Sequence, residues 1–138
     1  MLSGGSADGL AAWIGREVRA PGKTDYAGVA VDVETTPMPD AERAMLIVKN
    51  DFGAVVARQK VEPAAEHISW NGMDENGTTL PHGRYGFSVE SYRGDKLIEA
   101  REGRVFTEVT EVRLVGGRPL LLTAAGGELT VDDVTAIR

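Results

Sequence analysis

The chain has 138 residues, of which 42% are hydrophobic, so it can form one domain or two small ones with a packed core. Its net charge of −6 argues against nucleic acid as a partner, because such affinity depends largely on Lys and Arg neutralising phosphates. The absence of cysteine excludes disulfides, thiol catalysis and cysteine-based zinc sites. No apolar run approaches the roughly 18 residues that a membrane-spanning helix needs, so no membrane partner is expected.

The N-terminal stretch is polar and glycine-rich and shows no signal-peptide pattern. We therefore expect residues 1–9 to be a flexible tail or an added junction. The apolar residues of segment 10–20 recur at helical spacing, but part of the segment also alternates like a strand. Gly15 interrupts a helix, and Pro21-Gly22 ends either element, so these residues alone leave helix and strand open.

Short apolar or alternating runs follow, separated by turn residues. Period-two alternation with Val, Ile and aromatic residues is typical of half-buried strands. We predict strands at residues 29–33, 45–49, 55–61, 67–70, 84–92, 96–100 and 103–107. Roughly seven short strands at this spacing indicate an immunoglobulin-like or fibronectin type III sandwich.

A long polar loop joins the predicted strands at 67–70 and 84–92 and contains two Asn-Gly steps and a Pro-x-Gly segment. Asn and Gly tolerate positive φ and Pro fixes φ, so backbone chemistry shapes this loop. Trp70 and Tyr85 flank it, and we interpret both as core residues rather than interface anchors. The sequence does not decide what Trp13, near the N-terminus, packs against.

The alternation slips in the last quarter of the chain. Val105, Thr107 and Val109 share one face of a strand, whereas Val112 and Leu114 have the other parity. A one-residue change of phase indicates a β-bulge, or a strand that passes from one core to another. We interpret this point as a domain boundary.

Short apolar runs beyond the boundary are separated by two Gly-Gly pairs, which predict hairpin turns. Four such strands cannot enclose a good core alone, but a strand from residues 14–20 would complete a small barrel. The sequence therefore predicts a discontinuous barrel of residues 10–27 and 104–138, with a sandwich of residues 28–103 inserted into it.

Patterns typical of catalysis or metal binding are not found in the sequence, which has no zinc-protease, nucleophile-elbow, phosphate-loop or dinucleotide motif. His67 and His82 are interpreted as solvated surface residues. Asp74, Glu75 and Asn76 do not have the spacing of an EF-hand loop and are interpreted as turn formers. We therefore predict no enzyme activity, no cofactor and no metal.

Three segments together resemble a known family. Residues 70–89 read Trp-Asn-Gly, Asn-Gly and then Leu-Pro-x-Gly-x-Tyr-x-Phe-x-Val. Residues 14–18 read Ile-Gly-Arg-Glu-Val, and the chain closes with Gly-Gly and Asp-Val-x-x-Ile. This pattern resembles the core of the flagellar hook-capping proteins of the FlgD type over residues 13–138. The resemblance implies an all-β fold, with a fibronectin III/Ig-like sandwich inserted into a discontinuous Tudor-like barrel, and a strand at 14–18.

The resemblance also implies a function: a non-enzymatic scaffold that caps the distal end of the growing flagellar hook and assists assembly of hook subunits. It implies self-association into a cap, synthesis in the cytoplasm and export through the flagellar secretion system. In the family, a region associated with export and assembly precedes this core, and we expect the chain to lack it. The alternative is a ligand- or carbohydrate-binding Ig-like module of a secreted multidomain protein, with an exposed aromatic platform.

Loops carry binding on rigid scaffolds, so partner contacts are expected at the loops of the sandwich. They lie in the long loop and in the two hairpin turns near residues 51 and 94. The predicted contact residues are Phe52, Met73, Asp74, Glu75, Asn76, Arg93 and Asp95.

Overall fold

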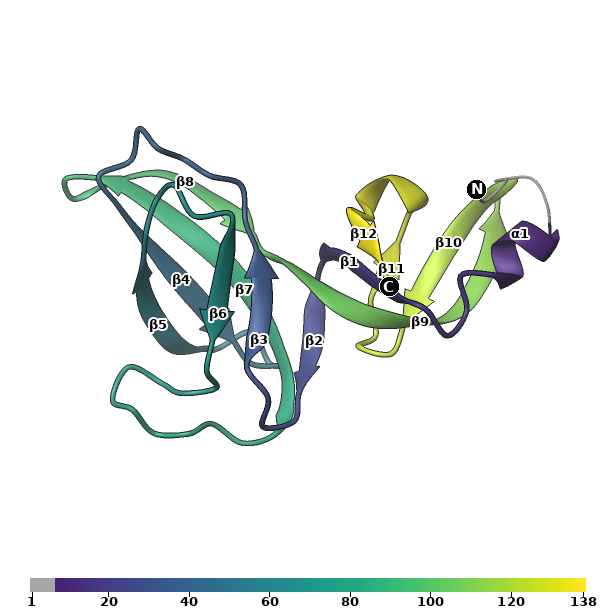
Figure 1. The fold of residues 1–138 in the computed structure, drawn as a ribbon, viewed down its shortest axis with the longest axis horizontal. Helices are drawn as coiled ribbons and strands as arrows, with labels where there is room; N and C mark the ends of the chain where they lie inside the picture. The colour runs from purple at the N-terminus through teal and green to yellow at the C-terminus, as the bar shows by residue number, and fades with distance from the viewer. Residues whose placement is uncertain (1–6) are drawn as a thin grey trace.

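The computed structural model describes residues 7–138, which form two lobes built almost entirely of strands (Figure 1). The elements are α1 (Ala7–Ala11), β1 (Glu17–Pro21), β2 (Lys23–Tyr26), β3 (Val31–Glu34), β4 (Arg43–Lys49), β5 (Val55–Val61), β6 (His67–Trp70), β7 (Gly83–Arg93), β8 (Lys96–Glu102), β9 (Arg104–Val115), β10 (Arg118–Thr123), β11 (Glu128–Leu129), the 3-10 turn η1 (Val131–Asp133) and β12 (Ala136–Ile137). The predicted all-β class is confirmed. Within this part of the chain, no helix has the length and apolar character needed to cross a membrane.

The larger lobe is a sandwich of two sheets. One sheet has the order β2-β7-β4-β5, with β8 also paired to β7, and the other contains β3 paired with β6. Inward-facing side chains of both sheets form one core, as expected for alternating strands. That core contains Tyr26, Val33, Ala44, Leu46, Val48, Ala57, Ile68, Trp70, Tyr85, Phe87, Val89 and Val105. The strands predicted at 55–61 and 67–70 are confirmed with the same bounds, and the hairpin of β4 and β5 is confirmed.

An aromatic cluster forms the centre of this core. Trp70 is fully buried, and its ring centroid lies 5.2 Å from that of Tyr26 and 5.3 Å from that of Tyr85. Trp70 Nε1 donates a hydrogen bond to the carbonyl of Met73 at 3.0 Å, and the Tyr85 hydroxyl donates to the carbonyl of Pro81 at 2.6 Å. The interpretation of Trp70 and Tyr85 as core residues is confirmed. Both rings also tie the two ends of the long loop to the sandwich.

The smaller lobe has the strand order β11-β10-β9-β1-β12 around a second core. That core contains Trp13, Val18, Ala20, Val109, Leu121 and Leu129, so Trp13 packs within the smaller lobe. The turns predicted at the two Gly-Gly pairs connect β9 with β10 and β10 with β11. No ladder joins β11 to β12 within residues 7–138, so closure into a Tudor-like barrel stays a prediction.

Strand β9 runs through both lobes (Figure 1). Val105 lies in the larger core and Val109 in the smaller one. In the ladder with β10, Val109 and Glu111 pair with successive residues, so Thr110 is the extra residue of a β-bulge. The change of phase predicted from the sequence is therefore both a bulge and a passage between cores.

The N-terminal predictions need correction. The strand expected at 14–18 begins only at Glu17, because Ile14 and Gly15 belong to a turn in which the Gly15 N–H donates to Val109 O at 2.8 Å. Residues 1–6 of the predicted tail lie outside the described residues, whereas residues 7–9 form part of α1.

Strand β2 was not predicted from the sequence. It pairs with β7, and its last residue, Tyr26, packs in the larger core. The division of the chain into domains stays a prediction, and the pairing of β2 favours a boundary near Gly22 over one after residue 27.

Glu34, the last residue of β3, lies where the lobes meet. Its Oε2 atom is 2.6 Å from Arg19 Nη2, its Oε1 atom is 2.6 Å from Arg104 Nε, and Thr135 Oγ1 donates to Oε1 at 3.1 Å. His67 pairs with Glu34 across the two strands, but its ring contacts another carboxylate and not that of Glu34. Burial alone would raise the pKa of Glu34, but the bonds from Arg104 and Thr135 and the charges of both arginines outweigh it, and the pKa is lowered.

We expect Glu34 to stabilise the fold in a pH-dependent way. A carboxylate with a lower pKa in the folded state contributes stability above its unfolded-state pKa, and this contribution disappears as the pH falls through the folded-state pKa. The free energy of unfolding of the wild type should therefore exceed that of Glu34→Gln near neutral pH. The difference should shrink as the pH falls below the ordinary value of 4.5. Urea unfolding across this range measures it.

Glu111→Gln serves as the control, because it removes an exposed ion pair with Arg113, and such pairs contribute little. A difference between wild type and Glu34→Gln that is the same at every pH would contradict this account.

Candidate interaction surface

The long loop between β6 and β7 is ordered by its own polar residues. Asn71 Oδ1 accepts the N–H of Met73 at 3.1 Å, and Asp74 Oδ1 accepts the N–H groups of Asn76 and Thr78, both at 2.9 Å. The Asp74 side chain thus closes a turn, as Asx residues commonly do. Across residues 7–138, no group of three His, Cys, Asp or Glu residues is placed to hold a metal ion.

The predicted contact residues fall at two ends of the sandwich. Strands β4 and β7 are antiparallel, and the last residue of β4 pairs near the start of β7. The β4–β5 turn and the long loop therefore lie at one end, and the β7–β8 turn lies at the other. The structure places Phe52, Met73, Asp74, Glu75 and Asn76 at the first end and Arg93 and Asp95 at the second.

Phe52 is held out into solvent by a well-bonded turn. Asn50 Oδ1 accepts the backbone N–H groups of Phe52 and Ala54, both at 3.0 Å. Beside it, Lys23 Nζ lies 2.9 Å from Asp51 Oδ1, and this hydrogen bond lowers the pKa of Asp51. Phe52 itself is 96% exposed, the highest value among the large hydrophobic residues that the structure describes. A rigid turn that displays a bare aromatic ring suits contact with a partner.

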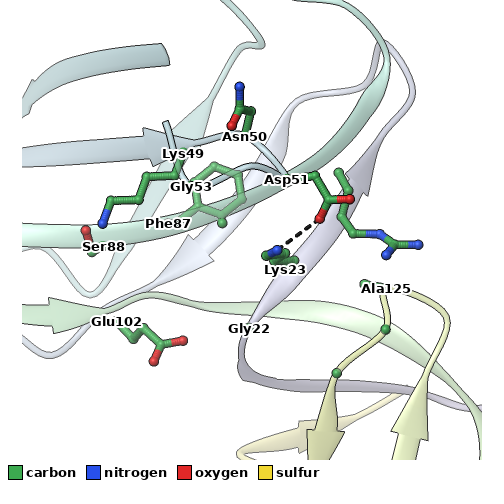
Figure 2. Close-up of a pocket in the computed structure, with 14 residues that line it drawn as sticks. Gly22, Lys23, Lys49, Asn50, Asp51, Gly53, Phe87, Ser88, Glu102 and Ala125 are labelled. Carbon is green, nitrogen blue, oxygen red and sulfur yellow. Dashed lines mark hydrogen bonds and ion pairs between the residues drawn. The ribbon is translucent and has the colours of Figure 1, made fainter. Parts of the chain in front are cut away.

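A groove that the sequence did not predict lies between the lobes next to this turn (Figure 2). Its volume is about 540 Å³. The groove is lined by the β4–β5 turn, the start of β2, the first half of β7, the end of β8 and the turn between β10 and β11. Its lining residues are Gly22, Lys23, Lys49, Asn50, Asp51, Gly53, Arg84, Gly86, Phe87, Ser88, Glu102, Ala125, Gly126 and Gly127. Segments so far apart in the chain share no local pattern, which is why the sequence did not reveal the groove.

The groove has mixed charge, and five of its lining residues are glycines. Lys23 and Lys49 contribute positive charge, while Asp51 and Glu102 contribute negative charge (Figure 2). Arg84 adds a third positive charge to the lining. The pKa of Asp51 is lowered, and a lower pKa makes a carboxyl group less suited to general acid–base catalysis at neutral pH.

The fold and surface define an all-β module with an Ig-like sandwich, a second smaller lobe and a turn with an exposed aromatic residue. A family model described as the FlgD Ig-like domain matches residues 23–95, more than half of the chain. The chain belongs to this family.

Solved structures give the same fold. FlgD from P. aeruginosa is 24% identical with a TM-score of 0.77, and the match covers 91% of this chain and 98% of that one. FlgD from Xanthomonas campestris, a structure described as giving insights into the hook capping essential for flagellar assembly, is 19% identical. Its TM-score is 0.62, and the match covers 93% of this chain and 96% of that one. Among curated proteins, none matches this chain.

We expect Gly72 to be essential for seating the long loop. Gly72 and Gly77 have nearly the same backbone, with φ of +83° and +80°, but a Cβ at Gly72 would lie 2.1 Å from the Tyr26 hydroxyl oxygen. Gly77 has open space around it. Gly77→Ala should cost about 1 kcal/mol from left-handed strain alone, whereas Gly72→Ala should cost about 3 kcal/mol because the clash adds to it.

Urea unfolding followed by tryptophan fluorescence measures both variants, and Gly77→Ala is the matched control for backbone strain. Equal losses in the two variants would show that contact between the loop and Tyr26 does not matter.

Proposed function

We propose that this chain is a non-enzymatic scaffold that caps the distal end of the growing flagellar hook and assists the assembly of hook subunits. The observation that carries the proposal is the match of residues 23–95 to the FlgD Ig-like domain. Membership of this family supports a role in flagellar hook assembly in general and association with the hook. Capping of the tip and scaffold behaviour are the finer part of the proposal.

The contacts with hook subunits lie, in this proposal, on the end of the sandwich that carries Phe52. Aromatic residues commonly dominate binding energy at interfaces, and Phe52, which is 96% exposed, has nearly its whole side chain available to a partner. Met73, Glu75 and Asn76 at the tip of the long loop supply a second, mainly polar contact on this end. Arg93 and Asp95 form a separate contact at the other end.

Self-association into a cap completes the proposal, together with export through the flagellar secretion system and a Tudor-like barrel for the smaller lobe. The family assignment supports these statements.

A carbohydrate-binding module would need an exposed aromatic platform. The structure instead buries both tryptophans, Trp13 and Trp70, to 5% and 0% exposure, and Tyr85 to 5%. No specific observation therefore favours the alternative function, and it is not proposed.

A bacterium that lacks its hook-capping protein provides the functional test. The full-length gene that encodes this chain should restore hooks and swimming, and Phe52→Ala should reduce both, because loss of a central aromatic contact costs about 2 kcal/mol of binding. Leu114→Ala is the control, since it removes an exposed apolar side chain of the smaller lobe. Electron microscopy of hooks and motility in soft agar give the measurements.

Failure of the unaltered gene to restore hook growth would overturn the proposed function. Full activity of Phe52→Ala would overturn only the assignment of Phe52.

Self-association has its own measurement, light scattering of the purified chain across concentration. The proposal expects the mass to rise with concentration or in the presence of hook subunits. A strictly monomeric chain under both conditions would contradict a cap formed by these residues.

A further inference from the structure

The two lobes have few covalent connections. The chain passes between them at Gly22, after β1, and along β9. Gly22 has a φ of +146°, and no atom outside its neighbours lies within 4 Å of where its Cβ would be, so no side chain packs on that face of the crossing. Lobes joined in this way are expected to move relative to each other unless other contacts prevent it.

Four segments meet at the Glu34 carboxylate described above. Glu34 comes from β3 of the sandwich, and Arg104, the first residue of β9, pairs with it there. Arg19 and Thr135 reach the carboxylate from the smaller lobe, from β1 and from the segment before β12. Both carboxylate oxygens are used, and the three charged side chains are only 16–21% exposed. Hydrogen bonds between charged groups in such a shielded place are short and strong. We call these four residues the Glu34 hub.

A second set of contacts fixes the arginine of β1. Arg19 Nε donates to Thr135 Oγ1 at 3.3 Å, and its guanidinium carbon lies 5.4 Å from the centre of the Phe106 ring. The carbonyl of Phe106 accepts a hydrogen bond from Thr24 Oγ1 at 2.8 Å, which again joins β9 to the sandwich strand β2. Arg19 therefore has little freedom to follow Glu34 if the lobes turn.

The groove side of the lobe junction is held more weakly. On that side Arg84 Nη2 donates a hydrogen bond to the carbonyl of Ala124 at 3.3 Å, between exposed groups. The groove and the Glu34 hub share no residue. A change at the hub therefore leaves the lining of the groove chemically intact.

We propose that the Glu34 hub is the lock that sets the angle between the two lobes and thereby the width of the groove. Glu34 neutralises two arginines that converge on it, so loss of its charge removes the attraction and leaves two like charges side by side. The lobes then turn about Gly22 and β9. This inference does not depend on the proposed function in hook assembly.

Distances between spin labels on the two lobes test the lock. The chain has no cysteine, so Lys60→Cys on β5 and Arg118→Cys on β10, both exposed, give one label on each lobe. The unaltered hub should give a single narrow distance distribution. Glu34→Gln should broaden and shift that distribution. The control Glu111→Gln, which breaks an arginine pair within the smaller lobe, should leave it unchanged.

Circular dichroism and urea unfolding establish that each variant is folded. If Glu34→Gln does not fold, Thr135→Val is the second variant, because it removes the hydrogen bonds of the Thr135 hydroxyl with Glu34 and Arg19 and keeps both ion pairs. It should broaden the distribution by a smaller amount. A distribution as narrow as that of the wild type in a folded Glu34→Gln variant, or in Thr135→Val if that is the variant used, would overturn the proposal.

Discussion

The structure depends on one continuous strand that belongs to two cores. β9 places Val105 in the larger core and Val109 in the smaller one, with only three residues between them. Neither lobe can lose its part of β9 without opening its own core. The bulge at Thr110 then shifts the facing of later residues, so that Val112 still packs inward although its parity has changed. A bulge of this kind adjusts the direction of a strand without ending it.

The parts of the fold that the sequence revealed are those fixed by local alternation. Strands β5 and β6 were predicted with their observed bounds because each is bordered by clear turn residues. β2 was missed because its four residues contain two charges and one buried ring, a pattern too short for periodicity. The strand at the N-terminus was placed too early because the position of Gly15 is decided by a bond to Val109, nearly one hundred residues away.

The candidate site divides in the same way. The exposure of Phe52 followed from its place in a tight turn, and the turn-forming role of Asp74 followed from its position before Asn-Gly. Arg93 lies at the other end of the sandwich because of how β4 and β7 pair. The pattern of residues within a single strand does not reveal such pairing. The groove depends on Lys23 meeting Asp51 across 28 positions, and no spacing rule anticipates such a pair.

Rigidity links these features to binding. A protein that recruits others by surface contact loses affinity when its own contact groups must be ordered on binding. Here the turn that carries Phe52 is fixed by Asn50, and the long loop is tied down by Trp70 and Tyr85. The Glu34 hub extends the same principle from single loops to the two lobes. Because the groove is lined by both lobes, its shape is only as well defined as the angle between them, so a carboxylate outside the groove sets its width.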